Sequence, residues 1–80
     1  MIYKVYIPNS QSLDDALSVE ASSNRLACSS FCYIMQCRDP EFAKNISGDK
    51  VCVVDDKEVN SYFVIDVVPI PDFIPRVWKQ

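Results

Sequence analysis

The most informative hydrophobic pattern in the chain lies within residues 17–37. It opens with apolar residues that alternate with polar ones, at Leu17, Val19 and Ala21. This period of two predicts a strand with one buried face. Ser22 or Ser23 follows, and a serine hydroxyl there can accept a hydrogen bond from the free N–H groups of a helix that begins near Asn24.

A helix over residues 24–37 is apolar around most of its circumference. Its central stripe has the spacing of a helix that lies on a sheet and contains Ala27, Phe31, Ile34 and Met35. The apolar arc is extended on one side by Cys28 and Cys32, and on the other side by Leu26, Tyr33 and Cys37. We therefore expect this helix to be covered on more than its sheet-facing side, either by the C-terminal residues or by a partner.

Further strands are predicted before this helix. Residues 1–7 alternate in polarity and are followed by proline, which predicts the first strand. Residues 8–15 are rich in turn formers. Within residues 12–21 two interpretations remain open: a turn followed by a strand, or a helix capped by Ser12 with two aspartates in its first turn. The first interpretation gives a sheet of four strands and the second a sheet of three.

After the helix a proline breaks the pattern, and Asp39 can cap a short second helix over residues 40–46. Gly48 is the only glycine of the chain and predicts a turn in the left-handed conformation. Two runs rich in β-branched residues follow, at 50–55 and 60–68, and predict a hairpin. Both runs are apolar on both alternating faces, which indicates central strands or a second covered face.

Residues 68–80 form a proline-rich segment, and three of the five prolines of the chain lie within it. Because proline lacks an N–H donor, the segment is predicted to be an extended arm rather than a helix or a central strand. Its large apolar residues are Ile70, Phe73, Ile74, Val77 and Trp78. Burying each is worth ~1.5–3 kcal/mol, so the arm is expected to pack on the sheet or the helix flank, or on a partner protein.

These elements predict one α+β domain over residues 1–80: an antiparallel sheet in the order β-β-α-β-β, the main helix on one face, and the proline-rich arm beside it. Eighty residues allow one domain with a marginal core. No run approaches the ~20 apolar residues that cross a bilayer. A cytoplasmic location with reduced cysteines is therefore expected.

The charge of the chain is modest and dispersed: eleven acidic and eight basic residues give a net charge of −3. This disfavours a dense phosphate-binding patch. Tyrosines such as Tyr6 and Tyr62 also have few basic neighbours along the sequence, which disfavours nucleic-acid recognition by stacking. The one acidic cluster contains Asp55, Asp56 and Glu58, and a solvated turn explains it most simply. Asp66 interrupts an apolar strand and is expected on the solvent face.

The residue types leave little room for catalysis. The chain has no histidine, so it lacks the commonest general base and the commonest metal ligand. A single glycine leaves no phosphate-binding loop. We therefore expect no catalytic residue, no cofactor and no enzyme activity. A metal site would need Cys28, Cys32, Cys37 and Cys52, but on one helix Cys37 points about half a turn away from Cys28, and small buried apolar residues are the simpler interpretation.

The order of elements over residues 1–68, with the motif VEASS at 19–23 before a helix that carries Ala27, resembles small phage-encoded proteins. Some of these are anti-CRISPR inhibitors. The resemblance implies a protein of the bacterial host cytoplasm that binds a host defence complex. Such inhibitors share an architecture but not a binding site, so no functional residue is transferred from them.

The leading hypothesis is a non-catalytic inhibitor that binds another protein or a protein–RNA complex and blocks its nucleic-acid groove or a subunit interface. Sequence-specific binding of nucleic acid and membrane binding are not expected. Candidate contact residues, chosen by residue type and expected exposure, are Asp55, Asp56, Glu58, Phe73, Arg76 and Trp78. Two alternatives remain: a homodimer that hides the helix flank of Leu26, Tyr33 and Cys37, and a regulator that binds a metal through its cysteines.

Overall fold

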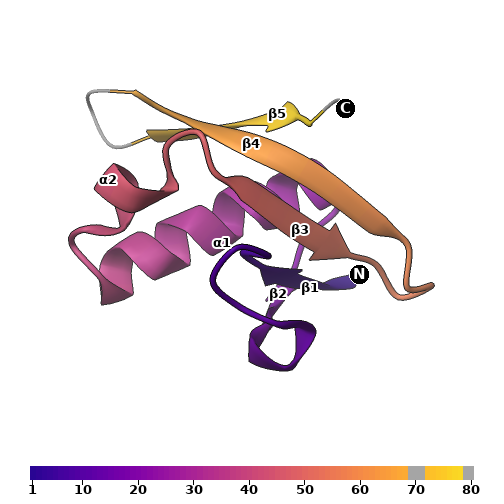
Figure 1. Ribbon diagram of the computed structural model, residues 1–80. Helices are drawn as coiled ribbons and strands as arrows, with labels where there is room; N and C mark the ends of the chain where they lie inside the picture. Colours follow the sequence, from indigo (N-terminus) through magenta and orange to yellow (C-terminus); the bar gives the residue numbers. More distant parts are fainter. Residues whose placement is uncertain (69–71, 79–80) are drawn as a thin grey trace.

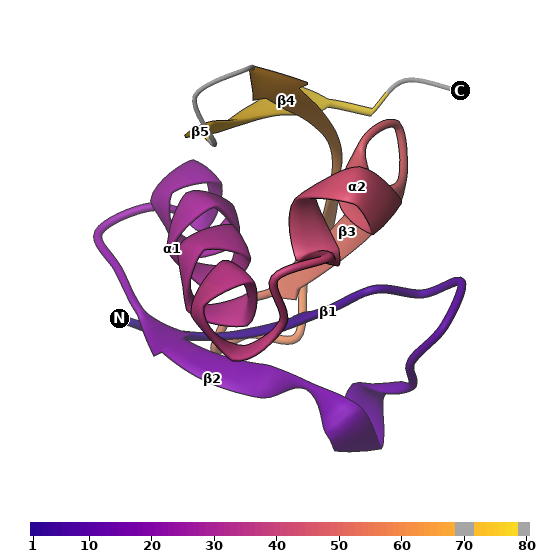
Figure 2. The same cartoon turned by 90° about the vertical axis from the view of Figure 1, so that its left-hand side faces the viewer.

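The structure, a computed structural model, describes residues 1–68 and 72–78 and contains one antiparallel sheet of five strands. The strands lie in the order β2-β1-β3-β4-β5. Their bounds are Ile2–Tyr6 for β1, Leu17–Glu20 for β2, Lys50–Val54 for β3, Asn60–Val68 for β4 and Asp72–Val77 for β5. Figure 1 shows the hairpin of β3 and β4, and Figure 2 shows the sheet curving around helix α1 (Asn24–Arg38). The predicted α+β fold is confirmed, with a fifth strand added at its end.

Helix α1 begins where the sequence predicts. The hydroxyl of Ser23 accepts a hydrogen bond from the backbone N–H of Leu26 at 3.2 Å, which satisfies one of the free donors of the first turn. The helix ends at Arg38, and Asp39 continues in an extended conformation. The following proline explains this end, because proline disfavours helical backbone at the residue before it.

A second helix, α2 (Phe42–Ile46), confirms the predicted short helix but starts later than expected. The carboxylate of Asp39 accepts a hydrogen bond from the N–H of Glu41 at 3.0 Å. Glu41 precedes the first residue of α2, so Asp39 caps the turn before the helix and not a helix that starts at Pro40. After α2, Gly48 has a φ of 78°. This is the left-handed conformation that the sequence predicts there, and it lets the chain turn into β3.

Both interpretations of residues 12–21 are partly right. A short 3-10 helix spans Leu13–Asp15, and strand β2 follows it directly. The carboxylate of Asp15 accepts from the backbone N–H of Ser12 at 3.4 Å and from its hydroxyl at 3.3 Å. Ser12 and Asp15 therefore form the predicted local start of a helix, but the helix lasts one turn because the next residues pair with β1.

The core lies between α1 and the inner face of the sheet. The inner face is formed by the odd-numbered residues of the strands, of which Val5, Val51, Val53, Phe63, Ile65 and Phe73 are at most 3% exposed. Helix α1 adds Ala27, Cys28, Phe31 and Cys32 to this core.

Two residues of the predicted helix stripe, Ile34 and Met35, are only half-buried. Cys28 and Cys32 take their place, so the buried arc of α1 is turned toward these two cysteines. The prediction assumed a flat sheet under one stripe, whereas the curved sheet brings all five strands into contact with α1 and so covers a wider, displaced arc.

The predicted extended arm is not a separate arm over residues 72–77, because these residues form the edge strand β5 of the sheet. Trp78 donates its backbone N–H to the carbonyl of Tyr62 at 3.0 Å. Because bonded pairs alternate in an antiparallel ladder, the nitrogen of Pro75, opposite Ile65, faces away from β4. Proline costs no ladder bond at this position, so an edge strand is possible. Residues 69–71 and 79–80 of the predicted arm, including Ile70, lie outside the described residues.

Within residues 1–68 and 72–78, no helix has the length and apolar character needed to cross a membrane.

Replacing Phe31 by alanine is expected to lower the free energy of unfolding by ~3–5 kcal/mol, because the side chain is 1% exposed and its ring packs edge-on against Phe42 at a centroid distance of 6.3 Å. Leu26→Ala on the same helix is the control: Leu26 is 51% exposed, and its loss should be under ~1 kcal/mol. Urea denaturation followed by circular dichroism measures both. Equal losses would contradict the described packing.

Candidate functional site

The acidic cluster of the sequence lies in the turn between β3 and β4, called here the acidic turn (residues 55–59). The carboxylate of Asp55 accepts hydrogen bonds from the backbone N–H groups of Lys57 and Val59, both at 2.9 Å. Backbone bonds join Asp55 to Val59 at 3.2 Å and Glu58 to Asp55 at 3.1 Å. Asp55 therefore has a structural task, and the carboxylates of the other two acids are left for contacts outside the turn.

Glu58 holds this turn in an uncommon conformation, with a φ of 63°. A left-handed backbone costs ~1–2 kcal/mol for a residue with a Cβ, and glycine is the usual residue at such a position in a hairpin turn. The side chain of Glu58 is exposed and therefore gains little from packing. A local cost of this kind is associated with positions that serve a function rather than stability.

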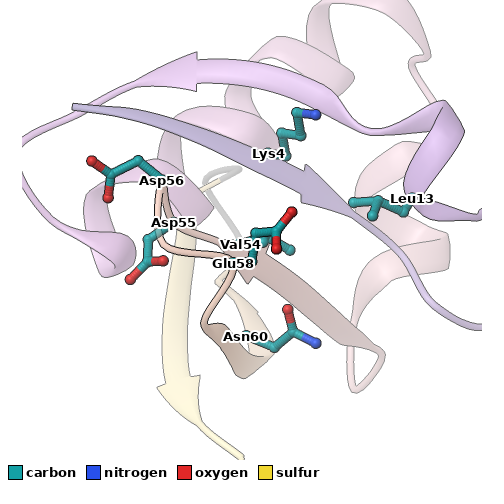
Figure 3. A pocket seen from close by; sticks show the side chains of 7 residues that line it. All are labelled: Lys4, Leu13, Val54, Asp55, Asp56, Glu58 and Asn60. Carbon is teal, nitrogen blue, oxygen red and sulfur yellow. The ribbon is translucent and has the colours of Figure 1, made fainter.

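An open hollow of about 440 Å³ lies beside the acidic turn. Its lining residues are Lys4, Leu13, Val54, Asp55, Asp56, Glu58 and Asn60 (Figure 3). Three of them stand in one line across the sheet, because Lys4 pairs with Val54 and Val54 pairs with Asn60. Figure 3 shows the Asp55 and Asp56 carboxylates pointing outward from the turn, away from Asn60. The hollow is thus lined by one lysine, two apolar residues and three acidic residues, of which Asp55 uses its carboxylate to hold the turn itself.

A row of aromatic residues crosses the sheet on its outer face, opposite to α1. The three rings stand in one line across the sheet because Tyr6 pairs with Cys52, Cys52 pairs with Tyr62, and the backbone N–H of Trp78 bonds to Tyr62. We call Tyr6, Tyr62 and Trp78 the aromatic row. Cys52 lies beneath it and is fully buried although it is on the outer face. A hydrogen bond with the Cys52 thiol, together with partial desolvation, raises the pKa of Tyr6.

A lysine sits on this row. The ammonium group of Lys50 is 4.3 Å from the centre of the Trp78 ring and 5.2 Å from the centre of the Tyr62 ring. The two rings themselves meet edge to face at 6.0 Å. These distances lie within the range of a cation–π interaction, which is worth ~0.5–1 kcal/mol at an exposed site.

A second cation on the outer face is already paired. Arg76 donates from Nε and from a terminal nitrogen to the two carboxylate oxygens of Asp66, at 2.6 and 3.2 Å. These hydrogen bonds lower the pKa of Asp66 and raise that of Arg76. Asp66 is on the solvent face, as predicted, and its side chain is 45% exposed.

The structure separates the candidate contact residues into two groups and removes one. Asp55, Asp56 and Glu58 gather at the hollow, and Arg76 and Trp78 lie on the outer face. The prediction that Phe73 is a contact residue is wrong. Alternation along β5 places it on the inner face at 2% exposure, where it packs against the rings of Tyr33 and Phe42 at 5.3 and 5.8 Å.

Sequence reasoning missed the residues that complete both sites. They are Lys4, Leu13 and Asn60 at the hollow, and Tyr6, Lys50 and Tyr62 on the outer face. Lys50 and Trp78 are far apart in the sequence, and only the pairing of β3, β4 and β5 brings them together. The signal that could have found them is the register of the hairpin, read together with the even-numbered positions of each strand.

The four cysteines do not gather into one site. Cys28 and Cys32 lie in the core, Cys52 lies under the aromatic row, and Cys37 is exposed near the end of α1. Among the residues that the structure describes, no group of three or more histidine, cysteine, aspartate or glutamate side chains could hold a metal ion. A hydrogen bond with Cys32, and burial, raise the pKa of the Cys28 thiol, which makes it a poor nucleophile.

Glu58→Gly is expected to raise the free energy of unfolding by ~0.5–1 kcal/mol, because it removes the cost of the left-handed conformation while making the unfolded chain somewhat more flexible. Lys57→Gly, at a position without a positive φ, should lower it by a similar amount. Thermal or urea denaturation measures both effects. A loss of stability in Glu58→Gly would contradict the strain assigned to Glu58.

Titration of the native protein with a thiol reagent is expected to label Cys37 rapidly and the three buried cysteines only slowly. The reason is that a buried thiol is inaccessible to the reagent. All four should react at once in denaturant, and Cys37→Ser should remove the fast phase. A fast phase that survives this substitution would show that a second thiol is accessible.

Comparisons with protein-family models, with curated proteins and with solved structures find no match to this chain. The two sites are therefore assigned from the geometry of the chain itself. They are an acidic turn with its hollow at one end of the sheet, and a basic and aromatic outer face next to it.

Proposed function

We propose that the protein is a non-catalytic inhibitor that binds a basic surface of another protein, or of a protein–RNA complex, through its acidic turn. The main observation behind this proposal is that a turn at the exposed end of a hairpin presents carboxylates and is held by its own hydrogen bonds. Figure 1 shows this turn projecting from one end of the molecule. Neither Asp56 nor Glu58 has an ion-pair partner among residues 1–68 and 72–78, so both charges are free for a target.

A nucleic-acid groove or a subunit interface rich in arginine and lysine is the natural complement to this turn. Opposite charges raise the rate of association and fix the orientation of the complex. The strain at Glu58 supports the proposal, because the chain accepts a cost in stability to keep a charged residue where glycine fits best. A host defence complex that holds RNA, the target implied by the resemblance to phage inhibitors, needs basic residues to bind the phosphates of that RNA.

The absence of histidine and the burial of the Cys28 thiol, whose pKa is raised, support a non-catalytic role. The proposed site of action, the reducing cytoplasm of a bacterial cell, follows from the resemblance, and the placement of all four cysteines as free thiols is compatible with it. No cofactor is required for binding through the turn.

A homodimer is the alternative that one observation favours. Leu26 and Tyr33 remain 51% and 43% exposed on the flank of α1, so the arm does not cover this flank fully. A sedimentation mass of one chain at micromolar concentration would exclude this alternative and leave the inhibitor proposal in place.

The double charge reversal Asp56→Lys with Glu58→Lys tests the proposed function. Asp55 stays unchanged because its carboxylate holds the turn. The tagged protein is used to capture partners from a bacterial lysate, and the affinity for the captured complex is then measured over a range of salt concentrations. We expect the variant to bind about tenfold or more weakly and to lose much of the salt dependence.

The matched control is Glu20→Lys with Glu41→Lys, which changes the net charge equally at two exposed residues outside the turn and outside the lining of its hollow. This control variant should bind the captured complex as tightly as the wild-type protein does. In addition, the captured complex should lose its nucleic acid when it binds the wild-type protein. Equal weakening in both variants, or binding unaffected by the turn reversal, would overturn the proposal.

A further inference from the structure

The outer face of the sheet carries a second set of chemistry that the acidic turn does not use. Three aromatic side chains, Tyr6, Tyr62 and Trp78, stand in one row across β1, β4 and the end of β5, and each is half-buried, with part of its surface open to solvent. Half-buried rings of this kind are held in place by their neighbours and still offer surface for stacking.

Cations flank this row on the side away from the acidic turn. Lys50 pairs with Val64, and Val64 pairs with Arg76, so the two cations lie in one line across β3, β4 and β5. This line is two residues along the strands from the aromatic row, which corresponds to roughly 7 Å. Asp66 offsets the charge of Arg76 in part, whereas the ammonium group of Lys50 contacts only aromatic rings among the described residues.

We propose that this outer face binds a single strand of nucleic acid, with bases stacked on the aromatic row and phosphates directed to Lys50 and Arg76. Aromatic rings next to a cationic line are the combination that binds single strands without reading sequence. The charge order favours this ligand over a peptide of mixed charge, because Lys50 and Arg76 lie on one side of the rings, with Asp66 as the one acid paired there, whereas three acids and a single lysine, Lys4, line the hollow on the other side. The phosphates are thereby assigned to one side.

Lys50 has a specific part in this arrangement. In the unbound protein its ammonium group rests over the faces of Trp78 and Tyr62. The flexible lysine stem lets the ammonium exchange these rings for a phosphate, which opens the ring faces to a base. Arg76 must likewise share its guanidinium between Asp66 and the phosphate, so Asp66 limits the affinity.

This inference does not rest on the proposed inhibitor function, because it uses none of the residues of the acidic turn. A strand held on the outer face and a protein bound at the turn could belong to the same protein–RNA target. Each site is tested with substitutions that leave the other unchanged.

The experiment uses the purified full chain and fluorescent oligouridine and oligothymidine of about ten nucleotides, with a duplex of the same length. Trp78 is the only tryptophan of the chain, so its own fluorescence reports stacking directly. We expect both single strands to raise the anisotropy of the label and to quench Trp78 emission, and we expect the duplex to bind more weakly.

Tyr62→Leu and Trp78→Leu are each expected to weaken binding about fivefold or more, since each removes one stacking surface. Lys50→Gln should weaken binding about threefold and lower the slope of log affinity against log salt by ~0.7. The matched control is Lys44→Gln on α2, where the lysine side chain is 79% exposed and the change in net charge is the same. This control should leave the affinity unchanged.

Asp66→Asn gives the opposite sign and is the sharpest test. It releases Arg76 from its carboxylate partner, and we expect it to tighten single-strand binding about threefold or more. Circular dichroism checks the fold of every variant. The proposal is overturned if neither oligonucleotide changes the anisotropy or the Trp78 emission, if Lys44→Gln costs as much as Lys50→Gln, or if the duplex binds as well as the single strands.

Discussion

The structure depends on the register in which β3 pairs with its two neighbours. Val53 lies opposite Val5 of β1 on the inner face, and Cys52 lies opposite both Tyr6 and Tyr62 on the outer face. Since side chains alternate with a period of two, a shift of one residue would exchange the two faces of β3. Strand β3 cannot set this register alone, because its valines and its cysteine are all buried. The register must come from the alternating polarity of β1 and from the turn that joins β3 to β4.

The acidic turn is therefore structural as well as a candidate contact surface. The carboxylate of Asp55 bonds to the N–H groups of Lys57 and Val59 and so fixes the length of the connection, which sets Val54 opposite Asn60. Every pair further along the hairpin follows from this one, including the position of Tyr62 beside Cys52. The position of the aromatic row thus depends on Asp55, although Asp55 lies in the turn and not in the row. A substitution of Asp55 would change both sites at once, whereas Asp56 and Glu58 can be changed alone.

Much of the fold could be predicted from the sequence because its signals are local. The cap at Ser23, the left-handed Gly48 and the two hairpin strands each depend on residues that are neighbours in the chain. Strand β5 was missed because three prolines in a short segment predict an extended arm, and only the bonding pattern of β4 shows that the backbone nitrogen of Pro75 faces away from β4. The acidic turn could be predicted for the same reason as the cap, because its residues are neighbours in the chain. The outer-face site could not, since its residues come from strands that are distant in sequence.

The two candidate sites carry opposite charge on one small protein, and the distance between them decides whether they interfere. The line of Lys4, Val54 and Asn60 borders the acidic turn, and the line of Lys50 and Arg76 lies four residues further along the strands. Four residues correspond to roughly 13 Å. Exposed charges are largely screened beyond about 8 Å at physiological ionic strength, so the carboxylates of the turn only weakly oppose an anion at Lys50. The net charge of −3 belongs to the whole chain and indicates the local charge of neither site. At low ionic strength the screening length exceeds this separation, and each site then responds to the charge of the other.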